Sequence, residues 1–224
     1  MSINMNNIVI SFKNVCFGYD PQRLVLNGLD FELKKGERVG LVGANGSGKT
    51  TLLQLVVGLI KRSSGIIEIF GEERKEEKDF LDVRKRVGLL FQDADDQLFC
   101  PTVAEDVAFG PFNLGKSRQE VSRIVDRTTE SLGIAEYKNR VTYKLSGGEK
   151  RLVSLATVLA MEPEVLLLDE PTYGLDEDSE YRILDILAKL PLAKIIISHH
   201  HDFLKKITDK VVRLHNAKIQ EHYL

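Results

Sequence analysis

The chain has 224 residues, of which 29% are charged and 43% are hydrophobic, and its formal net charge is −2. This length fits one α/β domain whose core needs no disulfide or metal, and the near-neutral charge gives no basic surface for nucleic acid, so we expect no nucleic-acid partner. The most apolar segment without charge, residues 52–60, excludes a membrane-spanning helix, because such a helix takes about 20 residues.

Two segments near the N-terminus alternate apolar and polar side chains. They are residues 8–19, "IVISFKNVCFGY", and residues 26–37, "LNGLDFELKKGE". A period of two is typical of half-buried strands, and the Gly and Pro residues between the segments indicate turns. We therefore expect an antiparallel β layer at the start of the chain.

Four short apolar runs follow, at residues 39–42, 87–91, 165–168 and 195–197. Runs that are apolar on both faces predict strands buried in a parallel sheet. Apolar residues recur with helical spacing in residues 49–62 and 179–190, and residues 103–136 are mostly helical in period. This alternation of strands and helices predicts a three-layer α/β fold with a helical insertion.

Residues 43–50, "GANGSGKT", fit the phosphate-loop pattern G-x-x-x-x-G-K-[ST] between an apolar strand and an amphipathic helix. Glycines let backbone N–H groups turn inward and bind anions at the start of a helix. Lys49 is then placed to reach the β- and γ-phosphates, and the Thr50 hydroxyl to ligate Mg²⁺. The expected nucleotide-binding residues of this segment are Gly43, Asn45, Gly46, Ser47, Gly48, Lys49, Thr50 and Thr51.

Residues 165–171, "VLLLDEP", end an apolar strand in two acids. The strand should deliver Asp169 to the carboxyl edge of the sheet, near Mg²⁺. Glu170 follows directly and is placed to orient or deprotonate an attacking water. Two acids at this point would also fit a capped, solvated helix start, but a phosphate loop in the same chain favours the catalytic interpretation.

Residues 145–151, "LSGGEKR", narrow the P-loop NTPases to one family. Together with Gln92, "LLLDEP" and "YGLD", they resemble the ATP-binding cassette (ABC) ATPases over nearly the whole chain. The resemblance implies an α/β fold with a P-loop NTPase (RecA-like) core and an N-terminal antiparallel β layer. It also implies a helical subdomain at roughly 93–160 that carries the signature motif, within a single domain of residues 1–224. The implied activity is a Mg²⁺-dependent ATPase, with ATP as its nucleotide.

The signature motif supplies a second set of expected nucleotide contacts. By resemblance these are Ser146, Gly147, Gly148 and Glu149. In the family this motif closes over the γ-phosphate bound by the opposite subunit of a head-to-tail dimer. Glu149 stands where glutamine is more usual, and Leu152 where the family often has arginine. Asp176 corresponds to the D-loop aspartate that communicates across the dimer.

Further roles follow from the resemblance one position at a time. Tyr19 stands where an aromatic ring stacks on adenine, and the alternative is a strand aromatic packed in the core. Gln92 matches the Q-loop glutamine, which reaches Mg²⁺ and the water and links to a membrane partner. The implied catalytic residues are Glu170, His199, Gln92 and Lys49, and the implied Mg²⁺ ligands are Thr50, Gln92 and Asp169.

Residues 91–115, "FQDADDQLFCPTVAEDVAFGPFNLG", are similar to the ATPases of cobalt and nickel importers and of energy-coupling factor vitamin importers. This implies a transmembrane coupling subunit, a substrate-binding membrane subunit, and a place at the cytoplasmic face of the cell membrane. The ATPase would be a homodimer or a heterodimer with a sister ATPase. The alternatives are a soluble ABC ATPase not coupled to transport and a cassette that binds ATP without hydrolysis. The sequence does not name the transported substrate.

Three consecutive histidines at 199–201 raise a question of register. The family has a switch histidine after the strand that follows Glu170, and both His199 and His201 match part of its pattern. The spacing to Asp209, at the expected entry of the next strand, favours His199. A metal site made by all three is not expected, because consecutive residues in an extended segment point to opposite faces.

Overall fold

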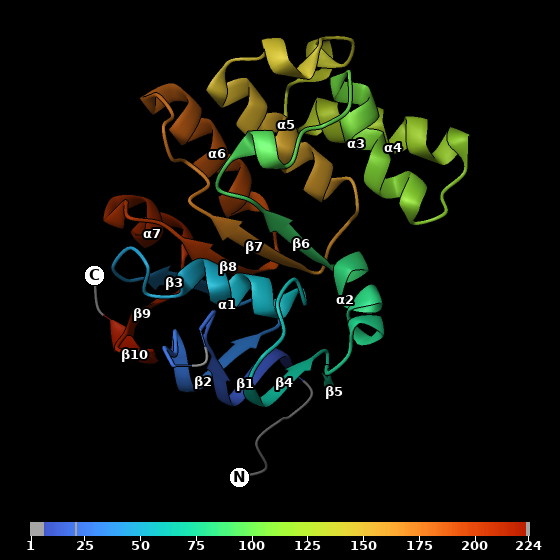
Figure 1. Cartoon of the computed structure of the whole chain (residues 1–224). Coiled ribbons are helices and arrows are strands. Elements are labelled where there is room, and N and C mark those ends of the chain that lie inside the picture. Colours follow the sequence, from blue (N-terminus) through green and yellow to red (C-terminus); the bar gives the residue numbers. More distant parts are fainter. Residues whose placement is uncertain (1–6, 21, 223–224) are drawn as a thin grey trace.

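The computed structural model describes residues 7–20 and 22–222, and its strands form two sheets (Figure 1). The antiparallel sheet has the order β2-β1-β4-β5. Its strands are β1 (Ile8–Phe17), β2 (Leu26–Lys34), β4 (Ser64–Ile69) and β5 (Glu72–Glu73). The expected pairing of the first two segments is confirmed, with Phe12 opposite Phe31.

The second sheet has the order β10-β9-β3-β8-β7-β6. Its strands are β3 (Arg38–Val42), β6 (Val87–Leu90), β7 (Val165–Asp169), β8 (Ala193–Ile197), β9 (Lys210–His215) and β10 (Lys218–His222). The four apolar runs predicted as parallel strands are β3, β6, β7 and β8, and all of their pairings are parallel. Only β10 joins antiparallel, through the hairpin with β9.

Seven α-helices complete the described part of the chain. They are α1 (Lys49–Val56), α2 (Phe80–Arg86), α3 (Val103–Asn113), α4 (Arg118–Ser131), α5 (Gly147–Leu159), α6 (Glu177–Lys189) and α7 (His201–Ile207). Helix α1 lies between the two sheets, whereas α3, α4, α5 and α6 lie beyond the parallel sheet (Figure 1). The antiparallel sheet therefore adds an outer layer to the predicted helix–sheet–helix core.

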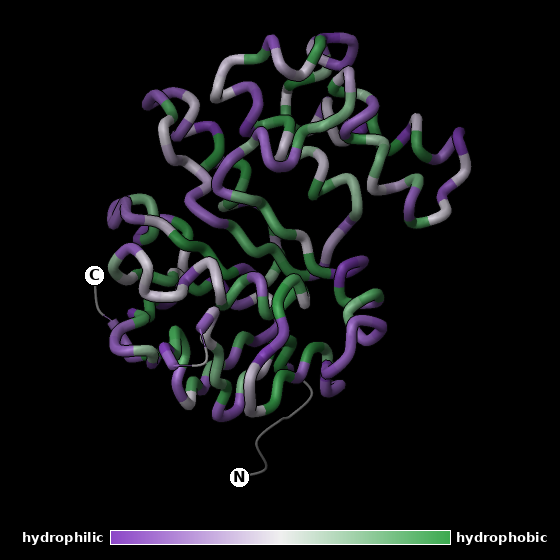
Figure 2. Tube along the Cα trace, viewed as in Figure 1, coloured by the Kyte–Doolittle hydropathy of each residue, from purple (hydrophilic) through white to green (hydrophobic). Residues whose placement is uncertain are grey.

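Alternation along β7 explains how one strand serves two cores. Leu167 packs with α1 and the antiparallel sheet, whereas Leu166 and Leu168 pack with the helices on the opposite face. Successive strand side chains point to opposite faces, so an all-apolar strand stabilises both layers at once. Figure 2 shows the hydrophobic residues gathered along the inner strands and the hydrophilic ones on the outer loops.

The helix predicted for residues 49–62 ends earlier than its periodicity suggests. Helix α1 stops at Val56, and Gly58 takes a left-handed φ of +66°. The N–H of Leu59 donates to the Gln54 carbonyl at 2.9 Å and the Gly58 N–H to the Leu55 carbonyl at 3.3 Å, which is a Schellman motif. The prediction was wrong beyond Val56 because this glycine caps the helix.

Replacing Gly58 by alanine should destabilise the protein more than replacing Gly36. Both glycines have positive φ, but a Cβ on Gly58 would lie 2.2 Å from the Phe80 ring, whereas one on Gly36 meets nothing within 4 Å. Left-handed strain costs about 1 kcal/mol in each variant, and overpacking adds about 1–3 kcal/mol at Gly58 alone. The loss of stability in each variant is measured from its midpoint of urea unfolding, provided that the denaturant slope m is unchanged. Equal losses in the two variants would contradict the role of the Phe80 contact.

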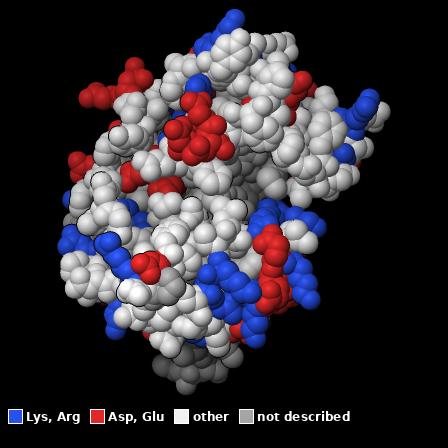
Figure 3. Space-filling view, viewed as in Figure 1, with Lys and Arg blue, Asp and Glu red and all other residues white. Residues whose placement is uncertain are grey.

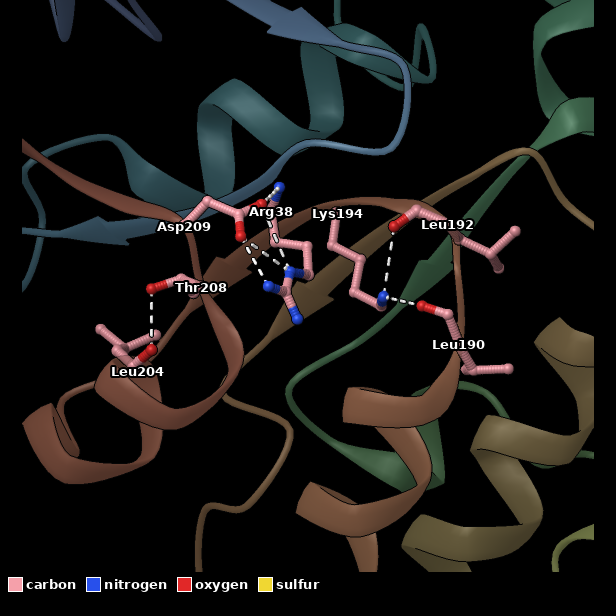
Figure 4. A network of polar contacts seen from close by, with 7 residues as sticks. All are labelled: Arg38, Leu190, Leu192, Lys194, Leu204, Thr208 and Asp209. Atoms are coloured by element: carbon pink, nitrogen blue, oxygen red, sulfur yellow. Dashed lines mark hydrogen bonds and ion pairs between the residues drawn. The ribbon is translucent and has the colours of Figure 1, made fainter.

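The amino edge of the parallel sheet is fastened by three charged side chains (Figure 4). Arg38 opens β3 and pairs with Asp209, from Arg38 Nη2 to Asp209 Oδ1 at 2.6 Å, while the Arg38 N–H donates to Asp209 Oδ2 at 2.9 Å. The fully buried Lys194 of β8 donates to the carbonyls of Leu190 and Leu192, which follow α6. The Arg38–Asp209 contacts join the starts of β3 and β9, and the Lys194 contacts join β8 to the end of α6; at the opposite edge, β3 runs into the segment 43–48 and β8 into His199.

Within the described residues, no helix combines the length and the apolar composition needed to cross a membrane.

Candidate functional site

The phosphate loop connects the end of β3 to α1. Gly48 precedes α1 with φ +103°, and a Cβ there would lie 2.6 Å from Val25 Cγ1, so only glycine fits. Lys49 Nζ folds back over the loop and donates to the carbonyls of Gly43 at 2.8 Å and Ala44 at 3.2 Å. The backbone therefore forms a turn closed by an ammonium group, directly before the positive end of a helix.

Two carboxylates face this loop from the end of β7. Asp169 is the last residue of the strand, and its Oδ2 accepts a hydrogen bond from the Thr50 hydroxyl at 2.6 Å. Glu170 follows with a left-handed φ of +47°, which is strained for a non-glycine residue. Both carboxylates are buried.

Glu170 has one carboxylate oxygen without a hydrogen-bond partner. Its Oε2 accepts from the His199 N–H at 3.4 Å, while Oε1 is buried and lies 3.5 Å from His199 Nε2, an ion-pair distance too long for a hydrogen bond. A buried acceptor left free at a cavity is costly unless another donor uses it. A water molecule between Glu170 and His199 would satisfy it.

Burial governs the ionisation of these groups. Desolvation raises the pKa of Glu170, and the nearby His199 acts in the opposite direction. Desolvation likewise raises the pKa of Asp169, against the hydrogen bond from Thr50. The pKa of Lys49 is lowered by burial, although both carboxylates favour its charged form. Two carboxyl groups and one ammonium group thus share a partly desolvated site, and groups with shifted pKa values are common in catalytic centres.

The oxygen set beside Lys49 fits a magnesium ion. Thr50 Oγ1 and Asp169 Oδ2 are 2.6 Å apart, and Gln92 lines the same cavity as both. Mg²⁺ prefers oxygen ligands, usually one or two side chains together with water and phosphate oxygens. A metal held by these oxygens would place positive charge in the cavity beside Lys49.

A cavity of about 590 Å³ collects most of the predicted residues. Its predicted members are Tyr19, Asn45, Gly46, Gly48, Lys49, Thr50, Thr51, Gln92, Asp169, Glu170 and His199. These come from five separate segments of the chain that meet at the carboxyl edge of the parallel sheet, where α/β proteins bind their ligands.

Tyr19 stands at the mouth of this cavity and is 67% exposed. Its hydroxyl lies 3.2 Å from the Thr51 hydroxyl and donates to Gln54 Oε1 at 3.3 Å, and its ring meets Phe17 edge to face. The alternative of a tyrosine packed in the core is therefore wrong. Most of the side chain is exposed and therefore accessible to an aromatic ligand.

The signature residues lie elsewhere in the chain. Ser146 caps α5 through a capping box with Glu149, and Arg140 pairs with the Glu149 carboxylate at 2.6 Å. Asp176 caps α6, accepting from the Ser179 N–H at 2.9 Å. Among the described residues that line the phosphate-loop cavity, none comes from the signature or the D-loop; Gly147 lines a neighbouring cavity of about 700 Å³ together with Gln92.

The three histidines have three different surroundings. His199 lines the phosphate-loop cavity beside Glu170. His200 Nδ1 lies 3.2 Å from Glu180 Oε1, and His201 begins α7 with its ring 6.4 Å from that of His222. The register chosen from the Asp209 spacing thus places His199, and not His201, against the carboxylate.

Two residues of this region were not predicted. Tyr173 lines both cavities and is 65% exposed, and Arg151 is buried beneath Gln92. The available signal for Arg151 was a charged residue directly before the mostly apolar run 152–159 of α5. The signal for Tyr173 was an aromatic side chain between Pro171 and the D-loop.

Comparisons with known proteins agree on one family. The family model described as ABC transporter matches residues 26–173. The chain is 52% identical over 197 residues to a Brucella suis protein named for ABC transporter ATP binding, covering 88% of this chain and 82% of that protein. It is 41% identical to the energy-coupling factor transporter ATP-binding protein EcfA of Methanocaldococcus jannaschii, over 94% of this chain and 77% of that protein.

A solved structure gives the same result in three dimensions. The cbiO1 protein of Clostridium perfringens, part of the ABC transporter complex cbiONQ, superposes with a TM-score of 0.86 at 33% identity. The match covers 96% of this chain and 87% of that one.

Proposed function

The chain belongs to the ABC transporter family and is an ATP-binding, ATP-hydrolysing member of it, and from this premise we propose that it energises an importer of the cobalt/nickel or energy-coupling factor class. The observation that carries the proposal is the meeting of Lys49, Asp169, Glu170 and His199 around one cavity. The names of similar proteins in Methanocaldococcus jannaschii and Clostridium perfringens support the transport class.

The proposed catalysis is positional and electrostatic. Lys49 and the phosphate-loop N–H groups hold the β- and γ-phosphates, and Thr50, Asp169 and Gln92 hold Mg²⁺. Glu170, with its raised pKa and free Oε1, accepts a proton from water as that water forms a bond to the γ-phosphorus and ADP leaves, while His199 contacts the γ-phosphate. A carboxylate with a raised pKa is a stronger base than an ordinary glutamate. Tyr19 stacks on the adenine.

We propose a head-to-tail dimer as the active unit. Ser146, Gly147, Gly148 and Glu149 start α5 away from the phosphate-loop cavity of their own chain, which supports their use by a second ATPase subunit. Asp176, at the start of α6, would lie between the two sites. The partner is a second copy or a sister ATPase. The chain would act as one ABC ATPase domain with residues 93–160 as its helical subdomain.

The membrane partners would dock beside Gln92. The segment after it exposes Asp93, Asp95 and Asp96, and Figure 3 shows acidic side chains above a hollow on this face. Next to them, the exposed rings of Phe99 and Phe109 meet edge to face at 4.8 Å. An apolar anchor bordered by charge suits a docking helix of a transmembrane coupling subunit. A substrate-binding membrane subunit completes the importer, with the ATPase at the cytoplasmic face of the cell membrane.

Copurification and transport test this function. The chain is expressed in its native host with an affinity tag, and in detergent it should copurify with a polytopic membrane protein. When the pair is reconstituted into liposomes, it should import its substrate only with Mg²⁺-ATP. Phe109→Glu should lose the partner while the isolated ATPase keeps its rate, because this ring lies outside the phosphate-loop cavity. Leu81→Glu is the matched control and should retain the partner, because Leu81 is also an exposed apolar side chain on a helix, α2, but lines neither cavity.

Other outcomes would point to the second candidate function. Recovery of soluble proteins alone, with full ATPase activity, would favour a soluble ABC ATPase not coupled to transport. Uptake of substrate that persists with Glu170→Gln would contradict the coupling of hydrolysis to import.

A further inference from the structure

Arg151 is a buried cation whose hydrogen-bond partners are backbone carbonyls rather than carboxylates. It is 4% exposed, and its guanidinium donates to two consecutive backbone carbonyls, those of Phe91, at 2.6 Å from Nη1, and of Gln92. Burial lowers the pKa of this group, while the carboxylates of Asp93 and Asp169 oppose that effect. A buried arginine is costly unless its donors are used, so these carbonyls account for its position.

The contact fixes the backbone of Gln92 and leaves its side chain to the cavities. Strand β6 ends at Leu90, and Phe91 and Gln92 continue as irregular chain above the sheet. Gln92 lines both the phosphate-loop cavity and the neighbouring cavity that contains Gly147. A loop residue that must place its amide near Mg²⁺ needs its backbone held by something other than a strand.

A second side chain ties the same segment to the same helix. Gln97 accepts from the Phe91 N–H at 3.3 Å and donates to the Ser154 carbonyl at 2.9 Å and the Thr157 hydroxyl at 2.8 Å. Lys150 adds an ion pair to Asp95. Segment 91–97, which we term the Q-loop, is thus joined to α5 at both ends. Helix α5 begins at the signature motif.

We infer that Arg151 is the positioning residue of the Q-loop, because its bonds to the Phe91 and Gln92 carbonyls fix the backbone from which the Gln92 side chain enters the phosphate-loop cavity. The inference rests on the proposed role of Gln92 in hydrolysis. Without this guanidinium the backbone of Phe91 and Gln92 would lose two of its contacts, and the Gln92 amide would no longer have one fixed position at the cavity.

Arg74 shows what a purely structural arginine looks like in the same chain. It is also 4% exposed and also donates to backbone carbonyls, those of Ile69 at 3.0 Å and Asp79 at 3.1 Å. These lie on the antiparallel sheet and the turn before α2, away from both cavities. Arg74→Met therefore controls for the loss of a buried guanidinium.

Arg151→Met should lower kcat about 10- to 100-fold, since small displacements of a positioned group cost rates of this order, while KM for ATP stays within about twofold. Hydrogen exchange should quicken at amides 91–97 and stay unchanged in loop 43–50. Arg151→Lys, which keeps the charge and reaches one carbonyl, should restore part of kcat. In a Gln92→Ala background, Arg151→Met should cause no further loss, because it acts through Gln92.

Arg74→Met should lower the unfolding midpoint but leave kcat within about twofold. If Arg151→Met behaves like Arg74→Met while Glu170→Gln is inactive, the proposed function stands and the positioning role is overturned. An equal loss from Arg151→Met with and without Gln92 would also overturn it. Should Arg151→Met fail to fold, Gln97→Ala breaks the second tie, and an unchanged kcat with unchanged exchange at 91–97 would overturn the inference.

Discussion

Glu170→Gln should reduce ATP turnover by about 10²- to 10⁴-fold, the range that a positioned general base supplies, while ATP still binds. The amide cannot accept a proton from water, but the contacts of Lys49 and Thr50 with the phosphate loop and Asp169 remain. Phosphate release under single-turnover conditions and binding of a fluorescent ATP analogue measure the two effects. With Mg²⁺-ATP the variant should elute as a stable dimer, alone or with its sister ATPase.

Glu162 offers a matched control for this substitution. It is also a glutamate with left-handed φ, at +53°, but it lies on the surface in an ion pair with Arg127. Glu162→Gln should leave turnover within about twofold, because exposed ion pairs contribute little. Turnover by Glu170→Gln at the rate of Glu162→Gln would show that another group activates the water.

The pH dependence of turnover follows from the same carboxylate. Burial raises the pKa of Glu170, and only the deprotonated form accepts a proton. As pH falls through this raised pKa, activity is lost earlier than an ordinary glutamate would lose it. The kcat of the native protein should therefore fall at acid pH. The residual kcat of Glu170→Gln should not show this fall, because the variant has no carboxylate to protonate.

Much of this site follows from the sequence because its motifs obey local rules. An apolar run followed by glycines or by acids marks the carboxyl end of a buried strand, and parallel strands bring those ends together. Hence Lys49, Asp169 and Glu170 meet as expected. The backbone of Glu170 is different, because its left-handed φ depends on the 3.0 Å bond from its N–H to the Ile197 carbonyl on β8.

The unpredicted features depend on partners far along the chain. The end of α1 relies on Gly58, whose missing Cβ makes room for Phe80. Arg151 binds backbone carbonyls some sixty residues away, and backbone oxygens carry no sequence signal. Neither contact can be predicted from local propensity, because both form only when the sheet and helices pack together.

His199→Ala should reduce turnover about 100-fold, whereas His201→Ala should leave it within about twofold. The reason is position: His199 Nε2 lies 3.5 Å from Glu170 Oε1 in the phosphate-loop cavity, while His201 starts α7 with its ring toward His222. His200→Ala should also be mild, because it loses only a half-exposed pair with Glu180. ATP binding should persist in all three variants, since the Lys49 and Thr50 contacts do not involve them. The comparison is made at saturating Mg²⁺-ATP, where binding differences cannot lower the rate. An inactive His201 variant beside an active His199 variant would mean that the spacing to Asp209 misled the assignment and that α7 must rearrange when ATP binds.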